Sequence, residues 1–215
     1  MVLEALNEQS RKLALQIIQN EVRSDRIALY NHSMNLDHTR KVCFVHNPKC
    51  MGTSLKGWLG LPVDNADHRF PTLMVNRLVW ESYTTIAVVR HPVSRFVSSY
   101  HFHCKSDYAG GYLAKYPELK SWDMDTYFQN MTNLEPYALA PQWKYTTHLR
   151  SEQGPDFLIK MEEAELPLRR LAERLRIQAP LPGFNRSKGS KTQPPESLLC
   201  KLQDYYQRDF ALFGY

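Results

Sequence analysis

The chain is organised around the run Val42-Cys43-Phe44-Val45-His46-Asn47-Pro48-Lys49-Cys50-Met51-Gly52-Thr53-Ser54-Leu55. Its apolar start, Val42 to Val45, predicts a buried strand. A tight turn follows, and Thr53-Ser54 are good N-terminal residues for a helix over 55–61. A strand that passes through a turn into a helix N-terminus directs free backbone N–H groups and the helix dipole toward one point. We therefore expect a phosphate or sulfate group at residues 49–55.

The residue order in this turn differs from the phosphate loop of nucleoside triphosphatases. That loop reads G-x-x-x-x-G-K-[ST] and places Lys directly before the hydroxyl residue. Here Lys49 precedes Gly52, and Gly52 is followed directly by Thr53. Lys49 still supplies a positive charge, and Thr53 and Ser54 supply hydroxyl donors. The alternative interpretation is a plain glycine-containing turn between a strand and a helix.

A second strand and helix follow about 40 residues later. The β-branched run 84–89 predicts a strand covered on both faces. Pro92 suits the first turn of a helix, whose apolar residues recur at three- and four-residue spacing while Ser94, Arg95 and Ser98 fall on its opposite face. Arg90 ends the strand. Arg90 and Ser98 can therefore face the crevice at the carboxyl ends of parallel strands, where open α/β sheets bind ligands.

Together the two units resemble the sulfotransferases. Pro-Lys-x-x-Gly-Thr-Ser resembles the 5′-phosphosulfate loop of that family, and the segment 90–100 matches its 3′-phosphate motif, R-x-P-x-x-R-x-x-S-x-Y. The resemblance covers residues 41–215. It implies an α/β fold, a P-loop-like three-layer sandwich with a small central parallel sheet flanked by helices. Residues 1–40 are then an N-terminal helical extension.

The resemblance also implies an activity. The family moves a sulfuryl group from 3′-phosphoadenylyl sulfate (PAPS) to a hydroxyl acceptor, here favouring a carbohydrate, and releases adenosine 3′,5′-bisphosphate. No metal is required by this chemistry. By resemblance, the donor is bound by the first turn, the second unit and a basic loop: Lys49, Cys50, Met51, Gly52, Thr53, Ser54, Arg90, Ser98, Arg186, Ser187, Lys188 and Lys191.

Two residues are candidates for catalysis. Lys49 can stabilise charge that develops on the sulfonate or on the bridging oxygen. A hydroxyl acceptor must lose a proton, and His68 is the predicted general base. It lies in a polar loop 22 residues before Arg90, close to the interval seen in related heparan-type enzymes. His46 is the alternative base, followed by His101 and His103.

Periodicity supplies further predictions for the remainder of the chain. Helices are expected over 1–24 and 72–80, from Ser121 onward, after a third strand at 156–162, and from Pro194 onward. Residues 25–40 are expected to be irregular, and 101–122 to form a long loop. The P-Q-x-x-Y segment at 141–145 resembles one that builds the acceptor side in the family. Glu162 and Glu163, at the end of the third strand, are interpreted as structural.

Composition limits the remaining possibilities. With 215 residues and 43% hydrophobic content, the chain fits one domain. The net charge of +5 suits an anionic ligand, and the scattered basic residues argue against a nucleic-acid partner. None of the four cysteines forms a C-x-x-C pair, which favours a reducing compartment. No apolar run reaches the roughly 18 residues that span a bilayer.

These features predict a cytoplasmic protein without an integral membrane segment, or else a lumenal domain that lacks its anchor. Two other functions stay open at this point: a nucleotide kinase with a degenerate phosphate loop, and a non-catalytic polyanion-binding domain. The acceptor and the oligomeric state are not specified by the sequence.

Overall fold

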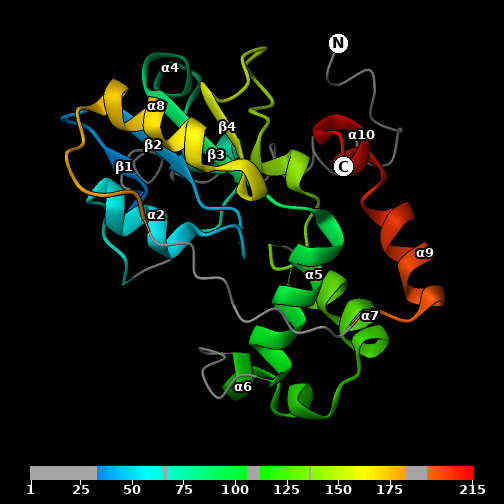
Figure 1. Cartoon of the computed structure of the whole chain (residues 1–215). Coiled ribbons are helices and arrows are strands. Elements are labelled where there is room, and N and C mark those ends of the chain that lie inside the picture. The colour runs from blue at the N-terminus through cyan, green and yellow to red at the C-terminus, as the bar shows by residue number, and fades with distance from the viewer. Residues whose placement is uncertain (1–32, 65–66, 106–111, 136, 183–192) are drawn as a thin grey trace, which may run out of the picture.

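The computed structural model describes residues 33–64, 67–105, 112–135, 137–182 and 193–215 (Figure 1). The helix expected over 1–24 lies outside the described residues, as does most of the basic loop that contains Arg186, Ser187, Lys188 and Lys191.

A four-stranded sheet in the order β1-β2-β3-β4 forms the centre of the fold. β2 (Val42–Val45), β3 (Thr84–Val89) and β4 (Phe157–Lys160) are parallel, and all three strands were expected at these places. β1 (Leu36–Asp37) pairs antiparallel with β2. The sheet is therefore mixed rather than wholly parallel, and residues 25–40 are not entirely irregular as expected.

Helices follow each parallel strand and continue to the C-terminus. The α-helices are α2 (Gly52–Leu59), α3 (Pro71–Met74), α4 (Arg77–Ser82), α5 (Pro92–Tyr100), α6 (Tyr112–Lys115), α7 (Met124–Leu134), α8 (Glu165–Leu175), α9 (Glu196–Tyr205) and α10 (Gln207–Phe213). A π-helical turn, η2 (His101–Lys105), extends α5, and the 3-10 turns within the described residues are η3 (Pro117–Ser121), η4 (Gln142–Tyr145) and η5 (Met161–Glu163).

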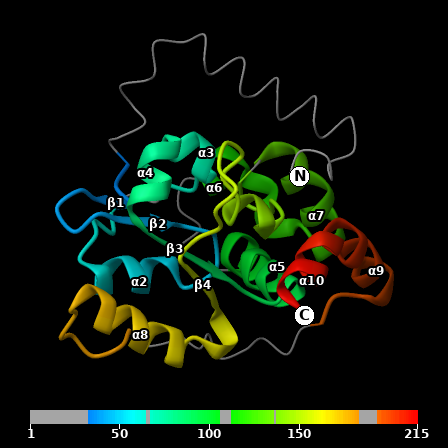
Figure 2. The ribbon, with the colours of Figure 1, turned by 90° about the horizontal axis from the view of Figure 1, so that it is seen from above.

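Both faces of the sheet are covered, because alternate residues of each strand point to opposite sides. Val42 and Phe44 pack with apolar residues of α2 and α8, whereas Cys43 and Val45 pack with Met74 and other residues near α3 and α4. Figure 2 shows α2 and α8 on one side of the sheet and α3 and α4 on the other. Burial on both faces explains why β2 and β3 are continuously apolar.

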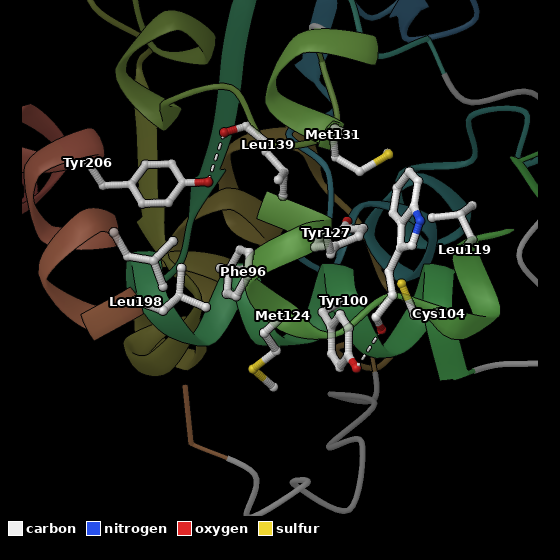
Figure 3. Close-up of a cluster of buried hydrophobic side chains, with 13 residues drawn as sticks. Phe96, Tyr100, Cys104, Leu119, Met124, Tyr127, Met131, Leu139, Leu198 and Tyr206 are labelled. Carbon is white, nitrogen blue, oxygen red and sulfur yellow. Dashed lines mark hydrogen bonds between the residues drawn. The ribbon is translucent and has the colours of Figure 1, made fainter. Parts of the chain in front are cut away.

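A second core lies beside the sheet, between α5, α7 and α9 (Figure 3). Phe96, Tyr127 and Leu198 are fully buried there. Its three buried phenols all have hydrogen-bond partners. Tyr100 donates to the carbonyl of Trp122 over 3.1 Å, Tyr206 donates to the carbonyl of Leu139 over 2.8 Å, and the Tyr127 hydroxyl lies 2.6 Å from Nδ1 of His103. This core fixes α5, and so the orientation of the residues that precede it.

Three predicted boundaries were wrong. The helix expected over 72–80 is two helices, because Asn76 caps the N-terminus of α4 by accepting from the Val79 amide. The segment 101–122 contains η2, α6 and η3 rather than a plain loop. The first helix begins at Gly52 and not at Leu55, with Met51 at its N-cap position.

Candidate functional site

The turns after β2 and β3 leave the same edge of the sheet. The two strands are parallel, with Val45 opposite Ala87, so their carboxyl ends lie side by side. The turns also touch, because the Arg90 Nη1 donates to the carbonyl oxygen of Lys49 over 3.3 Å. The two segments predicted to bind anions are therefore adjacent.

The turn after β2 has a strained backbone. Lys49 (φ 64°) and Met51 (φ 52°) both adopt the left-handed conformation, which costs a non-glycine residue about 1 kcal/mol or more. The first i→i−4 hydrogen bond of α2 runs from the Leu55 amide to the Met51 carbonyl, 3.0 Å. The amides of Gly52, Thr53 and Ser54 precede it and have no acceptor within the helix, which is the arrangement that binds anions.

The hydroxyl residues of this turn do not cap α2. Met51 occupies the N-cap position and its side chain makes no capping hydrogen bond. Thr53, which is exposed, and Ser54, which is half-buried, belong to the first turn of the helix. Both are thus N-terminal residues of the helix, as predicted, although neither occupies the N-cap position, and both lie on the turn that is predicted to bind an anion.

Cys50, which was predicted to contribute to donor binding, has a buried side chain. Its thiol lies 3.5 Å from the Pro48 carbonyl and 3.4 Å from Oε1 of Gln142. Burial raises the pKa of this thiol to about 12, so it is not a thiolate at neutral pH.

Gly52 provides the space for His46. A Cβ added at Gly52 would overlap Nε2 and Cδ2 of the His46 imidazole. That ring is only 6% exposed and lies between Phe44, with ring centroids 5.8 Å apart, and His68, 4.3 Å apart. The imidazole therefore has little freedom to move away from a larger residue.

The variant Gly52→Ala should lose stability and donor affinity together. Overfilling a packed site costs about 1–3 kcal/mol, or a decrease in Tm of roughly 2–12 °C for a chain of this size. Gly57→Ala is the matched control, because it lies on the same helix and its added Cβ would only approach Val63 Cγ1 at 3.7 Å. Thermal unfolding should show Gly57→Ala unchanged or slightly stabilised. Equal Tm values for the two variants would contradict the role assigned to Gly52.

Lys49 carries a readily titrated charge at the centre of the site. Its Nζ lies 3.8 Å from the centroid of the Phe102 ring on η2. Burial and the neighbouring guanidinium of Arg90 lower its pKa to about 8. Lys49 is therefore mainly cationic at neutral pH and loses its proton just above it.

His68 lies against the end of β2. Its Nδ1 is 2.9 Å from the backbone carbonyl of His46. A carbonyl only accepts, so Nδ1 carries the proton and the lone pair of the neutral ring is on Nε2. Burial lowers the pKa of His68 below 6.5 although this hydrogen bond acts in the opposite direction. His68 is therefore neutral, and able to accept a proton, at neutral pH.

The alternative bases are less suited to proton transfer. Burial lowers the pKa of His46 well below its ordinary value, and its Nδ1 has no partner among the described residues. His103 is buried, its Nδ1 is 2.6 Å from the Tyr127 hydroxyl, and burial followed by the charge of Lys49 lowers its pKa to about 4. His101 is half-buried on the same turn. η2 thus lies beside Lys49 and contributes to its electrostatic environment.

Arg95 was predicted to lie on the face of α5 opposite its apolar residues, yet its side chain is buried. It is 1% exposed, and its Nη2 donates to the carbonyl of Ala140 over 2.5 Å. Its Nη1 lies 3.5 Å from Oδ1 of Asn47, and its guanidinium lies 5.4 Å from the ring of Tyr206. Ser98, by contrast, is half-buried as a ligand-facing hydroxyl would be.

Gln142 is a residue of the site that was not predicted from the sequence. It is fully buried and contacts both turns: its Oε1 accepts from the Arg90 amide over 2.9 Å and from Nδ2 of Asn47 over 3.1 Å. The P-Q-x-x-Y segment was expected to build the acceptor side, yet this side chain lies between the donor turns. The P-Q-x-x-Y segment at 141–145 was the only feature of the sequence that pointed to Gln142.

A comparison with protein families identifies the family of this chain. A family model described as "Sulfotransferase family" matches residues 32–215. The chain belongs to the sulfotransferase family. Comparisons with curated proteins and with solved structures returned no match.

Membership in the sulfotransferase family supports sulfuryl transfer in general, and the match includes both turns that are predicted to bind anions. Among the described residues of this sulfotransferase, no group of three or more His, Cys, Asp or Glu is placed to hold a metal. None of the helices that the structure describes has the length and apolar character needed to cross a bilayer.

Glu162 behaves as a structural residue of the sulfotransferase. One carboxylate oxygen accepts from the backbone amide of His91 over 2.9 Å, and the other accepts from the Tyr215 hydroxyl over 2.9 Å. It thereby ties the end of β4 to the residue after Arg90 and to the C-terminus.

Proposed function

We propose that this protein transfers the sulfuryl group of PAPS to a hydroxyl of a carbohydrate acceptor and releases adenosine 3′,5′-bisphosphate. The observation that carries the proposal is the contact between Arg90 and the carbonyl of Lys49. It brings two cation-bearing turns to one edge of the sheet, as a ligand with two anionic ends requires. Family membership supplies the type of chemistry.

The charge of the site suits such a donor. A phosphomonoester contributes roughly −1.5 to −2 at neutral pH, and the phosphosulfate adds further negative charge. We assign the 5′ end of the donor to the amides of residues 52–54 with Lys49, and the 3′-phosphate to Arg90 and Ser98. Guanidinium binds phosphate through two parallel hydrogen bonds. By the family resemblance, Arg186, Ser187, Lys188 and Lys191 complete the donor site.

The reaction then needs positioning and charge stabilisation. Sulfuryl transfer, like phosphoryl transfer, spreads charge over the equatorial and leaving oxygens. Lys49 and the N-terminus of α2 are placed to stabilise this charge. His68 is the proposed general base, accepting the proton of the acceptor hydroxyl on Nε2.

The family resemblance also suggests a fold type and domain boundaries. We propose that the mixed sheet and the helices on both of its faces are a P-loop-like three-layer sandwich. The catalytic domain is assigned to 41–215, with 1–40 as an N-terminal extension. The family match begins within that extension, at residue 32.

Ligand selectivity tests the proposal. Adenosine 3′,5′-bisphosphate should raise the Tm of the full chain more than ATP with Mg²⁺ does, since a ligand at 100 times its Kd stabilises by about 2.7 kcal/mol. Purified protein should also move labelled sulfate from PAPS to at least one member of a glycan panel. Stabilisation by ATP with Mg²⁺ alone would instead indicate a nucleotide kinase. Steeply salt-dependent binding without nucleotide selectivity would indicate a polyanion-binding domain.

The variant Arg90→Ala should bind adenosine 3′,5′-bisphosphate about 10- to 150-fold more weakly, because a charged hydrogen-bonding group is worth about 1.5–3 kcal/mol. Arg169→Ala is the control, since Arg169 is an exposed residue of α8 that pairs with Glu165. Isothermal titration calorimetry should show wild-type affinity for Arg169→Ala. Unchanged affinity for Arg90→Ala would contradict the assignment of the 3′-phosphate.

A further inference from the structure

The side chain of Gln142 connects the two donor turns directly. On the side of β3, its Oε1 accepts from the Arg90 amide over 2.9 Å, and its Nε2 donates to the Arg90 carbonyl over 2.7 Å. On the side of β2, the same Oε1 accepts from Nδ2 of Asn47 over 3.1 Å. The orientation of the amide is fixed, because the Arg90 amide only donates and its carbonyl only accepts.

The partner on the β2 side is itself rigid. Asn47 is 1% exposed, and its Nδ2 also donates to the carbonyl of Val88 over 3.0 Å. Asn47 lies just after the carboxyl end of β2, and only Pro48 separates it from Lys49, the first residue of the turn that is predicted to bind an anion. A displacement of Gln142 would therefore act on the positions of both turns.

Asp209 of α10 fixes the backbone of Gln142. One carboxylate oxygen accepts from the backbone amide of Gln142 over 2.7 Å, and the other accepts from the backbone amide of Trp143 over 2.9 Å. Asp209 is fully buried, and α10 is remote in sequence from the donor turns. Asp209 of α10 therefore fixes the backbone of η4, while the Gln142 side chain binds the turns after β2 and β3.

We propose that Gln142 is a positioning residue that sets the separation between the two anion-binding turns. This proposal rests on the proposed function. It predicts selectivity for an adenosine phosphorylated at both its 3′ and 5′ positions over one phosphorylated at a single position. Each turn has its own local hydrogen bonds and can bind one anion alone. Both anions of one rigid ligand are bound at full strength only when the turns already have the matching separation.

The variant Gln142→Leu tests this by removing all of these side-chain hydrogen bonds. Calorimetry of the full chain should compare adenosine 3′,5′-bisphosphate with adenosine 5′-monophosphate. The preference of the wild type for the bisphosphate should fall about tenfold in the variant, within the range of coupling between residues in one hydrogen-bond network. Binding of the monophosphate should change by less than about threefold. A purely structural role would instead weaken both ligands by the same factor.

Two further variants make the test decisive. Tyr145→Phe lies on the same 3-10 turn and deletes the hydrogen bond from Tyr145 to the Tyr137 carbonyl, 2.8 Å, without touching either donor turn. It should keep the wild-type preference. Asp209→Asn retains the Gln142 side chain but leaves only one oxygen to accept from the two amides of η4. Asp209→Asn should reduce the preference for the bisphosphate in the same direction as Gln142→Leu does. It replaces Gln142→Leu in the test if that variant fails to fold.

The outcomes separate the two proposals. A wild type that does not prefer the bisphosphate would contradict the proposed function. A selective wild type whose preference persists in Gln142→Leu, or in Asp209→Asn where Gln142→Leu is not folded, would overturn the positioning role alone. Equal weakening of both ligands would overturn it as well. Loss of the preference in Gln142→Leu and Asp209→Asn, but not in Tyr145→Phe, would support it.

Discussion

Replacing His68 by asparagine should lower kcat for sulfate transfer by about 100- to 10,000-fold, the usual contribution of a general base. Asparagine can still donate to the His46 carbonyl through its amide nitrogen, so the local hydrogen bond is preserved while the accepting nitrogen is lost. Donor affinity should stay near the wild-type value because His68 is proposed to act on the acceptor. Initial rates and donor titrations measure the two quantities.

The pH dependence of this variant identifies the group that titrates. Burial lowers the pKa of His68 below 6.5, so the wild type should lose kcat/KM as the pH falls through that lowered value. The ratio of wild-type to His68→Asn kcat/KM should therefore decrease at acid pH, and the ratio cancels the titration of the donor phosphate near pH 6.

A matched control for His68 is His148→Gln. His148 is also buried, its Nε2 is 3.1 Å from the Val75 carbonyl, and burial lowers its pKa in the same direction. This variant should keep the wild-type kcat. A His68→Asn enzyme with near-normal kcat would remove His68 from the mechanism and direct attention to His46.

Replacing Lys49 by methionine should lower kcat by about 100- to 1,000-fold, the typical cost of removing one group that stabilises transition-state charge. Methionine keeps the length of an unbranched side chain and can still contact the Phe102 ring. Because the charge acts mainly on oxygens that gain charge during transfer, kcat should fall more than donor affinity does. Steady-state kinetics and calorimetry separate these effects.

The alkaline limb of the activity should belong to Lys49. Its pKa of about 8 in the free enzyme means that the charge is lost as the pH rises through that value. Wild-type kcat/KM should decline there, and the decline should be absent in Lys49→Met. Lys105→Met is the control, since Lys105 is an exposed cation at the end of η2. Equal losses in the two variants would mean that general charge, and not Lys49, supports the reaction.

The strands and the donor turns could be predicted because their determinants are local. An apolar run followed by Pro, Lys and Gly, and a second run followed by Arg and Pro, specify β2, β3 and the turns after them without reference to distant residues. Parallel pairing then brings the two turns together. The contact between Arg90 and Lys49 agrees with that prediction.

The residues that were missed depend on distant partners. Helix periodicity places Arg95 opposite the apolar face of its helix, and its burial depends on acceptors far along the chain: the carbonyls of Leu139 and Ala140 and Oδ1 of Asn47. Gln142 looks like an ordinary polar residue until Asp209 and Arg90 are known to surround it. The split between α3 and α4 was missed because an Asn cap was read as part of a continuous helix.

The most direct measurement is a crystal structure of the protein with adenosine 3′,5′-bisphosphate. We expect one nucleotide that spans the two turns. Its 5′-phosphate should contact the amides of residues 52–54 and Lys49, and its 3′-phosphate should contact Arg90 and Ser98. A nucleotide bound at another edge of the sheet, or one with a single phosphate bound and the other in solvent, would contradict the assignment of the donor site to these turns.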